Sequence, residues 1–312
     1  MNVIVTGGAG FLGSHLCERL LKNGDYVYCI DNLITGSFEN VKHLSGNIRF
    51  KFIQEDIISF NIENISIKPD IIFHLASPAS PPDYMKFPLE TLRVNSIGTD
   101  RCLSLAKKAG ARFLFTSTSE VYGDPLVHPQ KETYWGNVNP VGPRSVYDEG
   151  KRYGEALVMA YHRQYGLKTY LPRIFNTYGP RMRLNDGRVI PNFISQILSS
   201  KPLTIYGDGK QTRSFCYVDD LISAFLLLIE TDYHLPVNLG NPEEFTIIEL
   251  AEKMKKLSGA DISIKFLDGL PDDPKQRKPD ITLAKKILGW FPTIKLEEGL
   301  KKTLDYYIKV KK

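Results

Sequence analysis

Short apolar stretches alternate with longer amphipathic stretches along the first half of the chain. Six of them are short, rich in β-branched and aromatic residues and typical of buried strands: 2–6, 26–30, 48–53, 70–76, 112–116 and 167–174. Between several of these strands the apolar residues recur at helical spacing. Such regular alternation predicts an α/β fold with a doubly wound parallel sheet.

Two long helices are predicted over residues 89–108 and 145–165. Leu92, Ile97 and Leu103 are among the apolar positions of the first, and Leu157 and Tyr161 are among those of the second. In this topology both helices lie on the same side of the sheet. Each helix could therefore pack against its copy in a homodimer.

The composition of the chain changes after Tyr178, where predicted loops, prolines and basic residues dominate. We expect residues 1–177 to form the larger domain and residues 178–312 a smaller, interleaved domain that closes over the strand ends. The segment 206–237 is predicted to return to the larger domain, because residues 215–230 read as a strand followed by a helix.

Composition narrows the functional class. The chain has 312 residues, 42% hydrophobic and 24% charged, and a net charge of +5, all ordinary for a globular protein. The lysine-rich ending is typical of a solvated helix face, so neither nucleic acid nor a membrane surface is an expected partner. The four cysteines have no metal-ligand spacing. With a strand already beginning at residue 2 and no long apolar run, the expected location is cytoplasmic.

A glycine-rich turn links the first strand to the first helix. Gly7, Gly10 and Gly13 suit the tight turn, the close approach of a pyrophosphate and the packing of helix on strand in a Rossmann-like fold. Asp31 ends the second strand, where a carboxylate bonds a ribose hydroxyl and repels a 2′-phosphate. No arginine in the loop 32–36 reverses that preference. The pattern predicts NAD rather than NADP.

Residues that follow the third and fourth strands also suit the binding of NAD. Asp56 follows the third strand and suits either the adenine edge or a helix cap. The small residues after the fourth strand would let a dinucleotide lie across the strand ends. His74, on that strand, is interpreted as a packed core residue.

Tyr147 and Lys151 are four residues apart and therefore share one helix face. An ammonium and an oxidised nicotinamide both favour the tyrosine phenolate. Thr118, at the carboxyl end of a strand, could hold the same substrate hydroxyl. The trio suits removal of a proton from an alcohol while a hydride leaves its carbon. The alternative is a chance pair on an exposed helix.

Arginines are frequent in the second half of the chain, among them Arg188, Arg213 and Arg277. Guanidinium groups suit diphosphate and carboxylate, so an anionic ligand is expected. The alternative for each is a solvated basic surface.

With these motifs the chain resembles the extended short-chain dehydrogenase/reductases, and within them the UDP-glucuronate decarboxylases (UDP-xylose synthases). The resemblance covers almost the whole chain. It rests on the segments 74–82 (HLASPASPP), 116–125 (TSTSEVYGDP), 133–152 (TYWGNVNPVGPRSVYDEGKR), 173–182 (RIFNTYGPRM), 206–217 (YGDGKQTRSFCY) and 272–281 (DDPKQRKPDI). The third and the last point to the decarboxylases in particular.

The resemblance implies a role for each site residue. The catalytic residues would be Tyr147, Lys151, Thr118, Glu120 and Arg277. NAD would be bound by Gly7, Gly10, Phe11, Leu12, Gly13, Asp31, Asn32, Thr35, Gly36, Asp56, Ile57, Leu75, Ala76, Ser77, Tyr147, Lys151 and Thr177. The UDP-sugar would be bound by Pro78, Tyr84, Thr118, Glu120, Asn176, Arg188, Val189, Tyr206, Arg213 and Arg277.

One departure from the superfamily is informative. Nucleotide-sugar 4,6-dehydratases usually carry an Asp-Glu pair after the strand-end threonine, whereas this chain carries Ser119-Glu120. Without the aspartate, the chain lacks the acid that would protonate a departing 6-hydroxyl. A uronic acid has no 6-hydroxyl and can lose its carboxylate once C4 is a ketone. The resemblance thus implies conversion of UDP-glucuronate to UDP-xylose with tightly bound NAD that is regenerated each turnover.

Three alternatives remain open at this stage. A UDP-sugar 4-epimerase shares the threonine, tyrosine and lysine but needs no acid at Glu120. A decarboxylase could release the UDP-4-keto-pentose before re-reduction. A dinucleotide-sensing regulatory protein would keep the fold, although such proteins tend to lose the tyrosine or the lysine.

Overall fold

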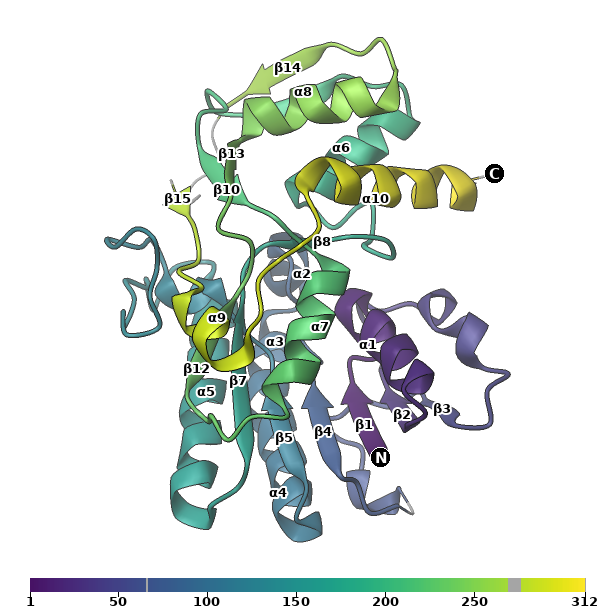
Figure 1. The fold of residues 1–312 in the computed structure, drawn as a ribbon, viewed down its shortest axis with the longest axis vertical. Coiled ribbons are helices and arrows are strands. Elements are labelled where there is room, and N and C mark those ends of the chain that lie inside the picture. The colour runs from purple at the N-terminus through teal and green to yellow at the C-terminus, as the bar shows by residue number, and fades with distance from the viewer. Residues whose placement is uncertain (66, 269–275, 312) are drawn as a thin grey trace.

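The larger part of the protein is built on one parallel sheet (Figure 1). The computed structural model describes residues 1–65, 67–268 and 276–311. The strands of the sheet are ordered β12 (Pro236–Leu239), β7 (Thr169–Ile174), β5 (Arg112–Phe115), β4 (Ile71–His74), β1 (Asn2–Thr6), β2 (Tyr26–Ile30) and β3 (Phe50–Ile53), and β6 (Ser117–Thr118) pairs with β7. All of these pairs are parallel, so the predicted doubly wound fold is confirmed.

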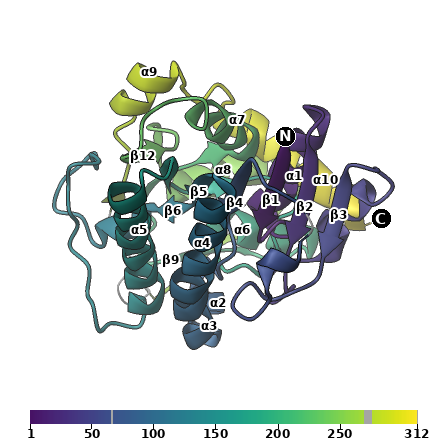
Figure 2. The same ribbon diagram turned by 90° about the horizontal axis from the view of Figure 1, so that it is seen from below.

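Alternation of side chains along the strands explains why helices cover both faces of the sheet. Val3 and Val5 pack with α1 (Phe11–Lys22) and α7 (Val218–Leu228). Ile4 points to the opposite face and packs with α4 (Thr99–Ala109) and α5 (Ser145–Tyr165). Figure 2 shows the two helix layers on either side of the strands. The apolar runs in the sequence follow from this burial on both faces.

The helix predicted over 89–108 is interrupted. The structure has α3 (Pro88–Arg93), a π-helical turn η4 (Val94–Gly98) and then α4. Within this turn the Asn95 amide donates to the Ser77 hydroxyl at 2.9 Å and to the Thr91 carbonyl at 2.8 Å. The interruption therefore ties this helix to the loop after β4. The helix predicted over 145–165 is confirmed as α5.

The smaller region lies beyond the carboxyl ends of the main strands (Figure 1). It contains α6 (Val189–Leu198), α8 (Ile247–Ser258) and α10 (Leu296–Lys311). Its strands are β9 (Leu203–Tyr206) with β14 (Ile264–Leu267), and β13 (Glu244–Thr246), β10 (Thr212–Ser214) and β15 (Gln276–Arg277). The remaining elements are α2 (Pro81–Lys86), α9 (Thr282–Leu288), η1 (Phe38–Asn40), η2 (Lys42–Leu44), η3 (Ile62–Asn64), η5 (Ser119–Tyr122), and the pair β8 (Thr177–Tyr178) and β11 (Cys216–Tyr217).

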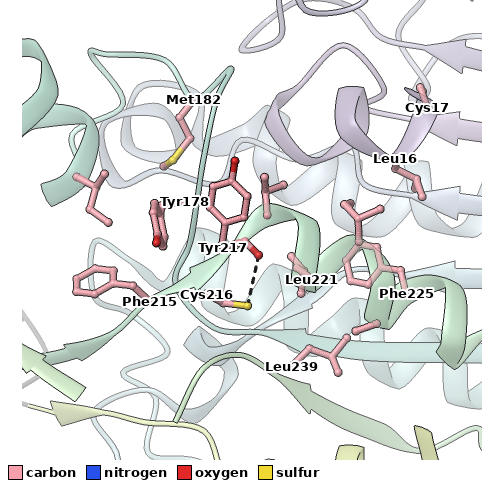
Figure 3. Packing of buried hydrophobic residues seen from close by; sticks show 14 of the residues in the cluster. Leu16, Cys17, Tyr178, Met182, Phe215, Cys216, Tyr217, Leu221, Phe225 and Leu239 are labelled. Atoms are coloured by element: carbon pink, nitrogen blue, oxygen red, sulfur yellow. Dashed lines mark hydrogen bonds between the residues drawn. The ribbon is translucent and has the colours of Figure 1, made fainter. Parts of the chain in front are cut away.

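The segment 206–237 divides between the two regions. Its strands β10 and β11 join small sheets, whereas α7 packs on α1 and leads to β12 at the edge of the main sheet. The short α9, far along the chain, also packs against β12. One continuous apolar cluster runs through both regions, and Figure 3 shows part of it around Tyr217, Leu221 and Phe225. The two regions therefore share a core.

Candidate active site

A cavity of about 620 Å³ lies between the carboxyl edge of the main sheet and the smaller region. Both regions supply its walls. Every residue that the sequence analysis assigned to binding or catalysis lines this cavity, from Gly7 near the start of the chain to Arg277 near its end. The fold therefore brings together all of the predicted site residues.

The glycine turn requires glycine for steric reasons. Gly7 has a φ of +69°, and a Cβ atom there would lie 2.7 Å from the backbone nitrogen of Ala76. A Cβ at Gly13 would lie 2.2 Å from the Gly7 carbonyl oxygen. The turn therefore passes close to both β4 and α1, and the N-terminal end of α1 faces the cavity. This arrangement fits the pyrophosphate of a dinucleotide.

Asp31 lies at the end of β2 with its carboxylate buried against backbone N–H groups. It accepts hydrogen bonds from Ala9 at 2.9 Å and from Leu33 at 2.8 Å. Burial raises the pKa of Asp31, and these hydrogen bonds oppose the shift. A Cβ at Gly36 would lie 2.8 Å from a carboxylate oxygen of Asp31. Asp31 also lines the cavity, and a carboxylate there fits a ribose with hydroxyls and disfavours a 2′-phosphate.

Asp56 lines the cavity and begins a turn, so the helix-cap interpretation is wrong. Its carboxylate accepts hydrogen bonds from the Ile58 N–H at 2.8 Å and from the Asn32 amide at 3.0 Å. Its carboxylate therefore stabilises a turn at the cavity wall, and its place at the adenine edge stays a prediction.

Tyr147 and Lys151 are buried on the inner face of α5, so the exposed-helix alternative is wrong. The Lys151 ammonium donates to the Thr116 carbonyl at 2.9 Å and lies 5.9 Å from the centroid of the Tyr147 ring. Burial lowers the pKa of Lys151 to about 7. Burial raises the pKa of Tyr147, against the effects of a hydrogen bond with Thr118 and of the Arg188 charge. The protein's own residues thus favour a neutral tyrosine, and a cationic cofactor ring would be needed to favour the phenolate.

Glu120 is held between two arginines from distant parts of the chain. Its carboxylate forms ion pairs with Arg277 and with Arg144. Burial alone would raise the pKa of Glu120, but the two guanidinium groups outweigh it and hold the pKa well below its usual range. Arg277 also donates to the Gly123 carbonyl at 3.0 Å. Glu120 is therefore a carboxylate in this arrangement.

The sequence analysis missed several charged groups beside the site, and three of them bear directly on its predicted residues. Arg144 lies three residues before Tyr147, within the segment 133–152 that carried the resemblance, and its position one turn away was the available signal. Asp148 is buried, and burial together with Glu120 raises its pKa. Asp186 grips Arg188 with both carboxylate oxygens, one of them at 2.7 Å from the second guanidinium nitrogen. No local pattern marks Asp186.

The aromatic wall of the site is formed by two tyrosines. The Tyr84 ring stacks on the Tyr147 ring with centroids 5.2 Å apart and planes 10° apart. The Tyr84 hydroxyl is buried, and the described residues offer it no hydrogen-bond partner. Tyr84 thus lines the cavity with this unsatisfied polar atom directly behind the Tyr147 ring.

His74 is a core residue, as predicted. It is 1% exposed, and its Nδ1 atom lies 2.6 Å from the Thr6 hydroxyl. Within residues 1–65, 67–268 and 276–311, no three His, Cys, Asp or Glu side chains are grouped so that they could hold a metal ion. Over the same residues, no helix combines the length and the apolar character needed to cross a membrane. Residues 272–275 of the last resemblance segment lie outside the described residues.

Comparison with known proteins gives a family match over most of the chain. Residues 3–240 match the model of the NAD dependent epimerase/dehydratase family. UDP-glucuronic acid decarboxylase 1 of Arabidopsis thaliana is 55% identical over 300 residues, covering 96% of this chain and 68% of that protein. UDP-glucuronic acid decarboxylase 1 of Xenopus tropicalis is 52% identical, covering 98% of this chain and 72% of that protein.

Solved structures with the same fold include two epimerases. The UDP-glucose 4-epimerase of Thermotoga maritima, determined with UDP-glucose, has a TM-score of 0.92 at 33% identity, covering 100% of both chains. The UDP-glucuronic acid 4-epimerase of Bacillus cereus, in complex with UDP-glucuronic acid and NAD, has a TM-score of 0.90 at 34% identity, covering 99% of this chain and 100% of that one. Identity to these epimerases is thus well below identity to the decarboxylases.

Proposed function

Since this chain belongs to the NAD dependent epimerase/dehydratase family, we propose that it is a UDP-glucuronate decarboxylase that produces UDP-xylose. The observation that carries the proposal is Glu120, held by two arginines in the same cavity as Tyr147. A tyrosine that can act as a base, next to a carboxylate held by arginines, suits a site that oxidises a sugar alcohol and then removes a carboxylate from the neighbouring carbon.

The first step is deprotonation of the C4 hydroxyl. Tyr147, as phenolate, accepts this proton, and the Thr118 hydroxyl orients the C4 oxygen. NAD, when bound, supplies the acceptor for the C4 hydride and later returns it, so the cofactor stays bound and is regenerated. Lys151, when protonated, places a positive charge near the Tyr147 ring, and the Arg188 charge also favours the phenolate.

The second step is loss of the carboxylate from a β-keto acid. The bond between C5 and C6 breaks, carbon dioxide leaves, and the electron pair moves toward the C4 carbonyl. C5 must then gain a proton. Glu120 is placed to relay that proton through water or to hold the distorted sugar ring, while Arg277 and Arg144 keep it in position. Re-reduction at C4, which the bound dinucleotide would supply, would then give UDP-xylose.

The product of UDP-glucuronate turnover tests this function directly. We expect purified protein to release one carbon dioxide per UDP-glucuronate and to form a UDP-pentose, read by mass, without a requirement for added NAD. UDP-glucose, which lacks the carboxylate, is the control and should give no carbon dioxide. An epimerase would give a product of unchanged mass from UDP-glucuronate, and a 4-keto product two hydrogens lighter than UDP-xylose would indicate release before re-reduction.

We also propose a homodimer, supported by an apolar surface on the helices beside the site. Leu89, Leu92 and Ile97 on α3 and η4 and Tyr153 on α5 are each more than a third exposed. Isolated apolar residues are common on surfaces, but these lie on contacting helices. The four buried free cysteines support the further proposal of a reducing, cytoplasmic location.

The dimer is tested by light scattering after size-exclusion chromatography. We expect a mass of two chains, and we expect Leu92→Glu to weaken the dimer by about tenfold or more, because a charge in the centre of a symmetric interface is buried twice. Leu126→Glu, on an exposed loop, is the matched control and should leave the mass unchanged. A single-chain mass for the unaltered protein at micromolar concentration would contradict the proposal.

A further inference from the structure

Gln130 has a buried side-chain amide, although it belongs to the largely exposed loop between η5 and α5. Its neighbours along this loop include Leu126, Trp135 and Val141, each at least 81% exposed, whereas Gln130 is 0% exposed. A buried amide needs partners for both ends. The Gln130 side-chain nitrogen donates to the Val127 carbonyl at 2.7 Å, and its side-chain oxygen accepts from the Lys278 N–H at 2.9 Å.

The backbone of Gln130 forms hydrogen bonds with the same distant segment, residues 278–280. Its N–H donates to the Lys278 carbonyl at 2.9 Å, and its carbonyl accepts from the Asp280 N–H at 2.8 Å. Three hydrogen bonds therefore fix residues 278–280, directly after Arg277. On its other side, Arg277 is paired in register with Arg213 of β10. The backbone that carries Arg277 is thus held from two sides.

A second buried amide connects this clamp, meaning the hydrogen bonds of Gln130 with residues 278–280, to the segment that carries Glu120. Asn238, at 0% exposure, donates to the Gln130 carbonyl at 3.0 Å and to the Asp280 carbonyl at 3.2 Å. Its side-chain oxygen accepts from the Tyr122 hydroxyl at 2.7 Å. Tyr122 follows Glu120 by two residues within η5. Both members of the Glu120–Arg277 ion pair are therefore tied, through their own segments, to one buried network.

We propose that Gln130 is a positioning residue for the decarboxylation step, fixing the segment 278–280 so that Arg277 meets Glu120. Gln130 does not line the cavity, so it acts through Arg277 and not on the substrate. The inference rests on the proposed function. Because a displacement of about 1 Å in a catalytic group can cost about 10²-fold in rate, a clamp of this kind has a large effect on chemistry at a distance.

Gln130→Met tests the proposal in the full-length protein with its bound dinucleotide. Methionine keeps the length and most of the volume of glutamine but lacks the acceptor for Lys278 and the donor for Val127. We expect carbon dioxide release from UDP-glucuronate to fall by about tenfold or more while NAD content stays unchanged. We also expect the 4-keto acid and the near-ultraviolet absorbance of the reduced cofactor to accumulate during turnover, because Arg277 pairs with Glu120 whereas Tyr147 and Thr118 carry the C4 oxidation. A loss of stability alone would not produce that signature.

A double-mutant comparison shows whether the effect passes through Arg277. In an Arg277→Lys background, Gln130→Met should add less than about twofold, because residues that act as one unit are not additive. Gln164→Met, on the exposed end of α5, is the matched control and should behave as the unaltered protein. If Gln130→Met does not fold, Gln130→Asn, which keeps the amide but shortens its reach, is scored in the same way.

The outcomes separate this inference from the proposed function. If the unaltered protein releases no carbon dioxide, the proposed function is wrong. If the unaltered protein is active and Gln130→Met is equally active, or if it loses rate without accumulating the reduced cofactor, Gln130 does not position Arg277.

Discussion

Tyr147→Phe is expected to slow carbon dioxide release from UDP-glucuronate by about 10²–10⁴-fold while NAD remains bound. The substitution removes the phenol oxygen that accepts the C4 proton and keeps the ring that stacks on Tyr84 at 5.2 Å. Without C4 oxidation there is no electron sink, so the later decarboxylation cannot proceed either. The measurement is release of labelled carbon dioxide, together with the ratio of dinucleotide to protein.

The pH dependence of the unaltered enzyme belongs to the same prediction. Burial raises the pKa of Tyr147, and a proton must leave Tyr147 before it can act as a base. We therefore expect kcat/KM to increase with pH up to the pKa of Tyr147 in the cofactor-loaded enzyme. Tyr153→Phe, six residues along α5 and half exposed, is the matched control and should keep normal activity. A Tyr147→Phe variant that turns over near the normal rate would show that another group is the base.

Glu120→Gln is expected to uncouple oxidation from decarboxylation. Glutamine can still accept hydrogen bonds from Arg277 and Arg144, but it carries no charge and no basic carboxylate. We expect the decarboxylation step to slow by about 10²-fold or more, so that the 4-keto acid and the reduced cofactor accumulate. Mass spectrometry of quenched reactions and absorbance of the reduced cofactor measure the two species.

A companion variant separates chemistry from stability. Glu120→Ala leaves two largely buried guanidinium groups without their carboxylate and should cost about 3–5 kcal/mol of unfolding free energy, measured by denaturant titration. Glu149→Gln, on the outer side of α5, removes a loose ion pair with Arg152 at 3.5 Å and should change neither property. A normal product profile from Glu120→Gln would remove Glu120 from the decarboxylation step.

Local sequence patterns predicted most strands and helices, because the conformation of these elements depends on residues close together in the chain. The six predicted strands match β1, β2, β3, β4, β5 and β7 to within two residues at either end, whereas the edge strand β12 and the short β6 were not predicted. The spacing of Tyr147 and Lys151 placed them on one helix face, and the glycine turn followed from a steric requirement at Gly7 and Gly13. The interruption at η4 was missed because it depends on a contact between Asn95 and Ser77, which lie on different elements.

What the sequence by itself determined is most of the parallel sheet, the dinucleotide turn and many of the residues that face the cavity. Only the tertiary structure decided how the charges in that cavity are paired. Arg277 pairs with Glu120 although they are 157 positions apart in the sequence. Gln130 and Asn238 fix the segments that carry the two members of this ion pair. The reason is physical: periodicity reports the conformation of neighbouring residues, whereas ion pairing, burial and the resulting pKa shifts depend on which distant segments come to share one interior.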